Sequence, residues 1–130
     1  MARLPAIVVT HQDYDRLRSL LDKADPDDRT VESLEEELNR ATLVHRAELP
    51  DDIVAMGCRV AFRNETTGRE HEMELVYPHE LQSGSDRISI LAPAGAALLG
   101  LKVGAVIDWP MQDREPLQIR ILSIAHPLAA

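Results

Sequence analysis

The 130-residue sequence has few aromatic side chains, one cysteine and a deficit of positive charge. Aromatic residues make up 3% of the chain, which disfavours base-stacking platforms and aromatic-lined ligand pockets. The single cysteine, Cys58, excludes an intramolecular disulfide and a cysteine-rich zinc site. Acidic residues number 22 against 14 basic ones, for a net charge of −8. A nonspecific nucleic-acid binder would carry a basic face, so this function is disfavoured.

The sequence also lacks a long hydrophobic run. No stretch approaches the roughly 20 apolar residues of a membrane helix, and the apolar segment at 6–9 is too short for the core of a signal peptide. The composition, with 45% hydrophobic and 28% charged residues, is that of an ordinary globular protein. These features predict a cytoplasmic protein with one small domain, or one domain and an appendage.

The first third of the chain carries two helical patterns. Thr10 and Asp13 form an N-terminal capping signature. Apolar residues then recur at spacings of three and four, the period of one helix face. They are Tyr14, Leu17, Leu21 and Ala24 in the first stretch, and Val31, Leu34, Leu38 and Ala41 in the second. Equal stripes joined by a short turn predict an antiparallel two-helix coiled-coil finger within residues 1–48. Each arm of about 15 residues would span roughly 20–25 Å.

The turn between these stripes is acidic. Asp25, Asp27 and Asp28 flank Pro26, which disfavours helix at the residue before it. The three carboxylates would lie together at the tip of the finger, where they could contact a partner. The alternative is a solvated helix start, because acids are common at helix N-termini for structural reasons.

From residue 49 onward the period changes to that of strands. Alternating segments at 58–63 and 70–77 flank a Thr-Gly turn and predict a β-hairpin. Further strands are predicted at 87–91, 104–109 and 117–124, with a short helix at 93–100 between a proline and a glycine. The predicted fold class is therefore α+β: a helical finger followed, at 49–130, by an antiparallel sheet with one short helix.

The stretch from Ile88 to Gly104, which reads ISILAPAGAALLGLKVG, resembles the C-terminal domain of the Gre transcript-cleavage factors. The upstream Val76-Tyr77-Pro78 is also similar. Together with so short a finger, these motifs are similar to the Rnk family, whose members are named as regulators of nucleoside diphosphate kinase. The resemblance implies an FKBP-like C-terminal domain. It also implies binding to RNA polymerase near the secondary channel, with this domain docked outside and the finger pointing inward.

Two departures from the Gre pattern shape the expected activity. In Gre factors, acids at the finger tip help to hold a catalytic Mg²⁺, and Asp25, Asp27 and Asp28 occupy the equivalent tip. The arms here are about half as long, so the resemblance implies channel occupancy and competition with Gre-type factors, without transcript cleavage. Where Gre factors carry Asn/Asp-Ser-Pro in their docking loop, this chain has Leu91-Ala92-Pro93. These three residues are therefore the candidates for apolar docking on the polymerase.

Other functions remain as alternatives. The chain could act directly on nucleoside diphosphate kinase through protein contact. An FKBP-like isomerase is disfavoured because such sites need an apolar pocket with several aromatics, and the sheet domain offers only Phe62, Tyr77 and Trp109. A pairing of Cys58 with His71 across the hairpin has no third catalytic member, so Cys58 is interpreted as a buried apolar residue. No catalytic residue, metal site or cofactor is predicted.

Overall fold

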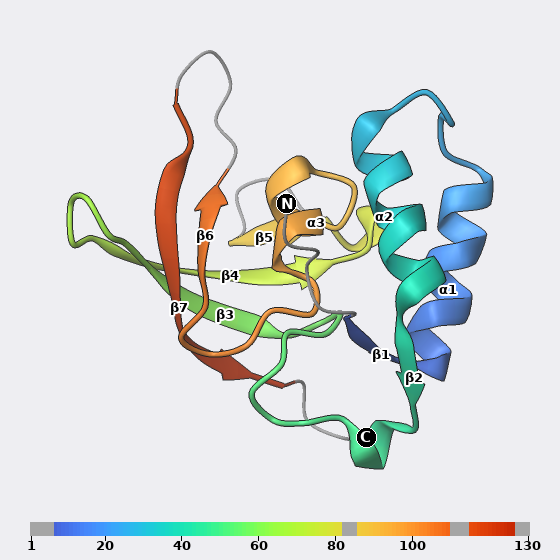
Figure 1. The fold of residues 1–130 in the computed structure, drawn as a ribbon, viewed down its shortest axis with the longest axis horizontal. Helices are drawn as coiled ribbons and strands as arrows, with labels where there is room; N and C mark the ends of the chain where they lie inside the picture. The colour runs from blue at the N-terminus through green and yellow to red at the C-terminus, as the bar shows by residue number, and fades with distance from the viewer. Residues whose placement is uncertain (1–6, 82–85, 110–114, 127–130) are drawn as a thin grey trace. The chain divides into compact units, whose positions relative to one another are not determined.

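A computed structural model describes residues 7–81, 86–109 and 115–126 (Figure 1). The chain forms two compact units, the first ending at Pro50 and the second beginning at Asp51. The backbone of Trp109 belongs to a strand, whereas its side chain lies outside the described part of the protein. Within the described residues, no helix is both long enough and apolar enough to cross a membrane.

The first unit combines two helices with two short strands. Its elements are β1 (Val8–Thr10), α1 (His11–Asp22), α2 (Arg29–Arg40), β2 (Thr42–Val44) and the 3-10 helix η1 (Arg46–Glu48). β1 and β2 pair in parallel, with Val9 opposite Leu43. A parallel pair requires a crossover connection, and the two helices supply it. The sequence patterns did not predict these strands.

The two helices begin and end for identifiable reasons. The Thr10 hydroxyl accepts a hydrogen bond from the Asp13 amide at 3.1 Å, which confirms the predicted N-terminal cap of α1. The predicted apolar stripes are buried at five positions, each contributing about 1.5–3 kcal/mol by leaving water. They are Leu17, Leu21, Val31, Leu34 and Leu38. Each helix has 12 residues and spans about 18 Å. The arms are thus shorter than predicted, because α1 already ends at Asp22.

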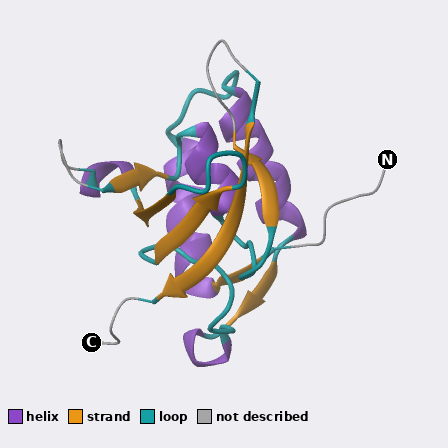
Figure 2. Ribbon diagram, turned by 90° about the vertical axis from the view of Figure 1, so that its left-hand side faces the viewer, coloured by secondary structure: helices purple, strands orange, loops and turns teal. Residues whose placement is uncertain are grey.

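The second unit contains a curled five-stranded sheet and one helix (Figure 2). Its elements are β3 (Arg59–Asn64), β4 (Glu70–Val76), the 3-10 helix η2 (Pro78–Glu80), β5 (Arg87–Ser89), α3 (Pro93–Leu98), β6 (Val106–Trp109) and β7 (Leu117–Ala125). The strand order is β5-β4-β3-β7-β6. These elements confirm the mixed α+β class, and they confirm the five strands and the helix predicted from residue 58 onward, apart from a few residues at their ends.

The direction of β5 differs from the prediction. β5 runs parallel to β4, whereas the other neighbouring strands of the sheet are antiparallel. Ten residues separate β4 from β5, far more than the two residues of a tight hairpin, which would force an antiparallel pair. Hydrophobic alternation is the same for both directions, so the sequence pattern could not distinguish them.

The core of the second unit lies between the sheet and α3, which contacts β5 and β6. Val60, Leu75, Leu98 and Ile121 are almost completely buried there. Gly95 sets how closely α3 approaches the end of β5, since a Cβ at this position would lie 2.0 Å from the Ser89 carbonyl oxygen. Only glycine fits at that distance, so this helix and strand are held by a close backbone contact.

Candidate functional site

The turn between α1 and α2, residues 25–28, is called the acidic turn here. All four residues are exposed. A carboxylate oxygen of Asp25 accepts a hydrogen bond from the Asp27 amide at 2.9 Å, and the Asp25 carbonyl accepts one from the Asp28 amide at 3.1 Å. These bonds form an Asx-type turn, which fixes the direction in which the chain re-enters α2. Asp25 therefore has a local structural role.

Asp28 is the N-cap of α2. Its backbone is extended, and its Oδ1 accepts hydrogen bonds from the amides of Thr30 at 2.8 Å and Val31 at 3.4 Å. These amides would otherwise be unsatisfied at the helix start. The negative charge also lies at the positive end of the helix dipole. The carboxylate of Asp28 is thus engaged by its own helix.

Asp27 differs from its two neighbours. Its side chain is exposed, and its carboxylate makes no hydrogen bond or ion pair with any described residue. Such an exposed carboxylate can bind a cation, or accept a hydrogen bond from a partner, without breaking a hydrogen bond or ion pair to another described residue. Of the three sequence-predicted acids, Asp27 is the one whose charge the fold leaves available.

Polar contacts brace the two helices behind the acidic turn. Arg18 on α1 donates to the Tyr14 hydroxyl at 3.1 Å and, across the pair, to the Asn39 side chain on α2. The Arg18 guanidinium also lies 5.2 Å from the centre of the Tyr14 ring, a cation–π contact. The Arg18 side chain therefore links α1 to α2.

The second predicted surface, Leu91–Pro93, is called the α3 entry here. The Leu91 amide donates to the Ser89 hydroxyl at 3.1 Å, and the Ala92 amide donates to the Ser89 carbonyl at 3.0 Å. Ala92 is the N-cap of α3 without a side-chain cap, and Pro93 stands in the first turn. Pro93 is exposed, whereas Leu91 and Ala92 are half-buried. This is a short apolar surface on a backbone that Ser89 holds in place. It belongs to the second unit and the acidic turn to the first.

The sheet carries a cluster of ion pairs that the sequence patterns do not predict. Arg59 on β3 contacts Glu72, Glu74 at 4.0 Å and Asp86 at 3.6 Å, and Arg87 lies 3.8 Å from Glu74. The hydrogen bond with Glu72 raises the pKa of Arg59. Arg59 and Glu74 are directly opposite in the strand register, a cross-strand pairing that modestly stabilises the β3–β4 pair.

A second ion-pair group lies at the other end of the hairpin. Glu65 accepts hydrogen bonds from Arg120 on β7 and from Arg63 on β3. The bond from Arg120, followed by that from Arg63, lowers the pKa of Glu65. The register places Arg63 directly opposite Arg120, so the carboxylate of Glu65 relieves the repulsion between two like charges.

Cys58 is fully buried, as interpreted from the sequence, but its histidine neighbour is not the one considered there. Its Sγ lies 3.3 Å from Nδ1 of His126, and Nε2 of His126 lies 3.0 Å from the Asp51 carbonyl oxygen. His71 instead packs against Phe62, with ring centres 5.9 Å apart. Among the described residues, no three His, Cys, Asp or Glu side chains converge as metal ligands would.

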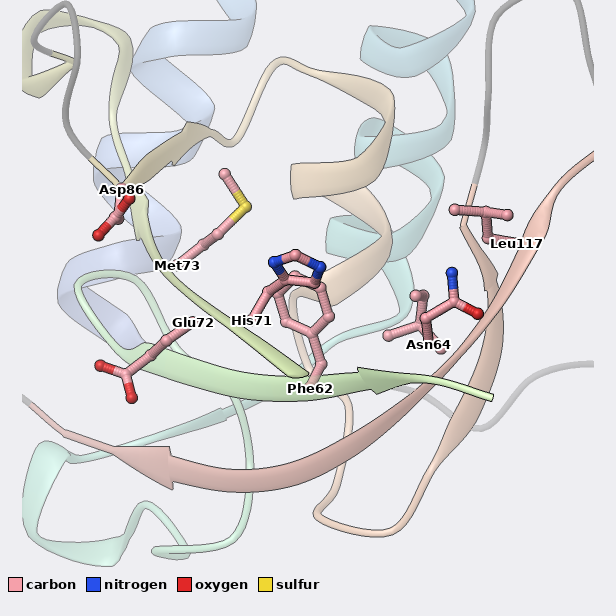
Figure 3. Close-up of a pocket in the computed structure, with 8 residues that line it drawn as sticks. Phe62, Asn64, His71, Glu72, Met73, Asp86 and Leu117 are labelled. Carbon is pink, nitrogen blue, oxygen red and sulfur yellow. The ribbon is translucent and has the colours of Figure 1, made fainter. Parts of the chain in front are cut away.

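A pocket opens on the sheet near the turn between β3 and β4 (Figure 3). It has a volume of about 570 Å³, within the range of small-molecule sites. Eight residues line it: Phe62, Asn64, His71, Glu72, Met73, Asp86, Leu117 and Ile119. The sequence alone does not reveal this pocket, because most of its residues come from three separate strands, β3, β4 and β7.

Two family models match the chain. Residues 5–44 match "Rnk N-terminus", and residues 49–126 match "Transcription elongation factor, GreA/GreB, C-term". The chain is 34% identical over 123 residues to the "Regulator of nucleoside diphosphate kinase" of Escherichia coli K12, covering 94% of this chain and 90% of that protein. It is 35% identical over 80 residues to transcription elongation factor GreA of Clostridium botulinum, covering 62% of this chain and half of that protein.

Solved structures give a consistent result. A GreA/GreB elongation factor from Nitrosomonas europaea has a TM-score of 0.85 at 37% identity, covering 95% of this chain and 100% of that chain. GreA factor homolog 1 of Thermus thermophilus has a TM-score of 0.52 at 22% identity, with 93% and 99% covered, which supports the fold alone. The matches to both units and the near full-length relative place the chain in the Rnk family, whose C-terminal part is that of the GreA/GreB transcription elongation factors.

Proposed function

We propose that this protein is a non-enzymatic regulator that binds RNA polymerase at the rim of the secondary channel and competes there with Gre-type factors. In this proposal residues 1–48 form a short coiled-coil finger, and residues 49–130 form an FKBP-like domain that docks on the outside of the polymerase. The membership of the chain in a family of transcription elongation factors and regulators supports it.

The observation that carries the proposal is the length of the helix pair. Each helix has 12 residues, so the pair reaches about 18 Å. The residues shared with GreA of Clostridium botulinum make up only half of that protein, and in this chain the GreA/GreB model begins at residue 49. We take the unmatched half of that protein to include a longer finger than the helix pair of this chain. A carboxylate that falls many ångströms short of an active-site metal cannot help to bind it, because catalytic placement fails at errors near 1 Å.

The acidic turn then acts by its charge, at a distance from the polymerase metal. Asp27 is the residue we assign to this role, because Asp25 and Asp28 are engaged in the turn and the helix cap. A carboxylate facing the channel would repel incoming anionic nucleotides. Since the attraction or repulsion of exposed charges decays over about 8 Å at physiological salt, its effect should weaken as salt increases.

The α3 entry is the proposed docking surface. Leu91, Ala92 and Pro93 expose apolar atoms on a segment that Ser89 fixes through two backbone amides. A fixed apolar patch loses little conformational entropy when it is covered. The expected contact is therefore apolar burial, in place of the polar contacts implied by Asn/Asp-Ser-Pro in Gre factors.

Binding to purified RNA polymerase in competition with a labelled Gre factor tests the proposal. We expect the wild-type protein to displace the Gre factor and Leu91→Asp to lose at least about tenfold in affinity, because a charge would be buried against the partner. Leu81→Asp is the matched control, since Leu81 is 49% exposed and lies outside the α3 entry. Failure of the wild-type protein to displace the Gre factor would refute the proposal.

Direct action on nucleoside diphosphate kinase is the second candidate function. It is favoured by the name of the Escherichia coli relative, which shares 34% identity over nearly the whole chain. A pull-down with purified kinase and with purified polymerase distinguishes the two. Binding to the kinase alone would favour direct regulation, whereas binding to the polymerase alone would mean that any effect on the kinase acts through transcription.

A further inference from the structure

The pocket on the sheet of the second unit has an apolar floor that neither the ion pairs nor the proposed polymerase contacts use. Phe62 and Ile119 form its most buried part, with 4% and 3% of their surfaces exposed. Met73 and Leu117 are half-buried beside them. The exposed His71 ring lies over Phe62 (Figure 3). Phe62, Ile119, Met73 and Leu117 thus give the pocket an apolar lining.

The polar groups of the pocket are largely occupied within the protein. The Asn64 oxygen accepts hydrogen bonds from the amides of Thr66 at 2.9 Å and Thr67 at 3.2 Å, which shape the β3–β4 turn. Glu72 and Asp86 both interact with Arg59. A small polar ligand needs several convergent polar groups to fix its orientation. Because these groups already have partners, the pocket suits an occupant held by apolar contact and by charge.

Asp86, which lines the pocket, belongs to the ion-pair cluster of the sheet, where carboxylates outnumber guanidinium groups. Within the ion-pair cluster, the carboxylates of Glu72, Glu74 and Asp86 face the guanidinium groups of Arg59 and Arg87. Three negative charges against two positive ones leave one negative charge uncompensated. Asp86 is the most accessible of these groups, with 74% of its side chain exposed. A cation placed beside it would complete the cluster.

We propose that this pocket binds an extended segment of a partner protein that inserts one aliphatic side chain over Phe62 and places a lysine or arginine beside Asp86. Apolar burial supplies the affinity, and the exposed charge of Asp86 selects basic segments over acidic ones. The pocket shares no residue with the acidic turn or the α3 entry, and the inference does not rest on polymerase binding.

The test uses the full ¹⁵N-labelled chain and NMR titration with three capped pentapeptides. The probe is Gly-Lys-Leu-Lys-Gly, its charge-reversed twin is Gly-Glu-Leu-Glu-Gly, and a third, Gly-Lys-Gly-Lys-Gly, lacks the aliphatic side chain. We expect saturable shifts of the amides of Phe62, His71, Met73 and Ile119 with the probe. Binding of each of the other two peptides should be at least about tenfold weaker.

Three variants locate the site. Met73→Arg should weaken probe binding at least about tenfold, because it fills the pocket and adds a like charge. Leu81→Arg makes the same charge change at an exposed position outside the pocket and should leave binding unchanged. Asp86→Asn alters only an exposed side chain. It should therefore fold normally and weaken the probe selectively, even if Met73→Arg does not fold.

Several results would overturn the inference. Equal binding of the three peptides would show a nonspecific contact, and equal binding of the two lysine peptides would show a purely electrostatic surface. Shifts confined to residues outside the pocket would place the contact elsewhere. No shift at millimolar probe, or shifts in the pocket only with a neutral aromatic fragment such as phenol, would exclude a basic protein segment as the occupant.

Discussion

Single substitutions of the carboxylates in the acidic turn should show that Asp28 stabilises the start of α2, whereas Asp27 does not. Asp28 accepts two amide hydrogen bonds at the start of α2, at 2.8 and 3.4 Å. Loss of such an N-cap costs about 1 kcal/mol, within a range of 0.5–2 kcal/mol. Asp28→Ala should therefore destabilise α2 by about that amount, a factor of five or so in its opening equilibrium.

Asp28→Asn isolates the hydrogen bonds from the charge. Asparagine keeps an oxygen acceptor and caps helices about as well as aspartate. The remaining cost is that of the charge at the helix dipole, about 0.3–1 kcal/mol at low salt. Asp27→Asn should change stability by less than about 0.5 kcal/mol, because no described residue bonds to that carboxylate.

Amide hydrogen exchange in the first turn of α2 is the appropriate assay, since it reports local opening even if the two units unfold separately. Protection of Thr30 and Val31 should decrease most in Asp28→Ala, less in Asp28→Asn, and not measurably in Asp27→Asn. Equal losses in Asp28→Ala and Asp28→Asn would show that charge, rather than the hydrogen bonds, stabilises the helix start. A large loss in Asp27→Asn would refute the division of roles.

Two further predictions concern the second unit. Gly95→Ala should lower the free energy of unfolding in urea by more than about 3 kcal/mol, because its Cβ would lie 2.0 Å from the Ser89 carbonyl oxygen. Gly68→Ala, at φ +79° with open space around it, should lower it by only about 1 kcal/mol, from backbone strain. Similar losses in the two variants would contradict the packing argument. Glu65→Gln should lower stability at pH 7, and its difference from wild type should shrink as pH falls below about 4. The reason is that hydrogen bonding to Arg120 lowers the folded-state pKa of Glu65. The contribution of Glu65 to stability is therefore present above its unfolded-state pKa and is lost as pH falls through its folded-state pKa. A stability difference between Glu65→Gln and wild type that does not depend on pH would contradict this.

The sequence predicted those helices and strands that are long enough to show a hydrophobic period. Stripes over residues 14–24 and 31–41 gave both helices, and alternation gave the β3–β4 hairpin and β7. It could not predict β1 and β2, since three residues carry no measurable period. Nor could it predict that β5 runs parallel to β4, because alternation is blind to strand direction.

The sequence shows which residues could form the candidate sites, but it does not show how these residues are arranged. Three acids in a turn are visible in the sequence, but their hydrogen bonds distinguish Asp27 from Asp25 and Asp28 only in the folded chain. The partner of Cys58 was equally hidden. His126 is 68 residues away in sequence, and only the register of β3 and β7 brings it near. The pocket depends on the same long-range pairing.

The most direct test of the central claim is a transcript-cleavage assay on backtracked RNA polymerase, with this protein alone and with this protein added in increasing amounts to a Gre factor. A helix pair of about 18 Å on a Gre-like domain should produce no cleavage by itself and should inhibit cleavage by the Gre factor in a concentration-dependent way. Cleavage by this protein alone would show that its tip reaches the polymerase metal. A Gre reaction that continues unaffected at saturating protein would show that the two do not share a binding site.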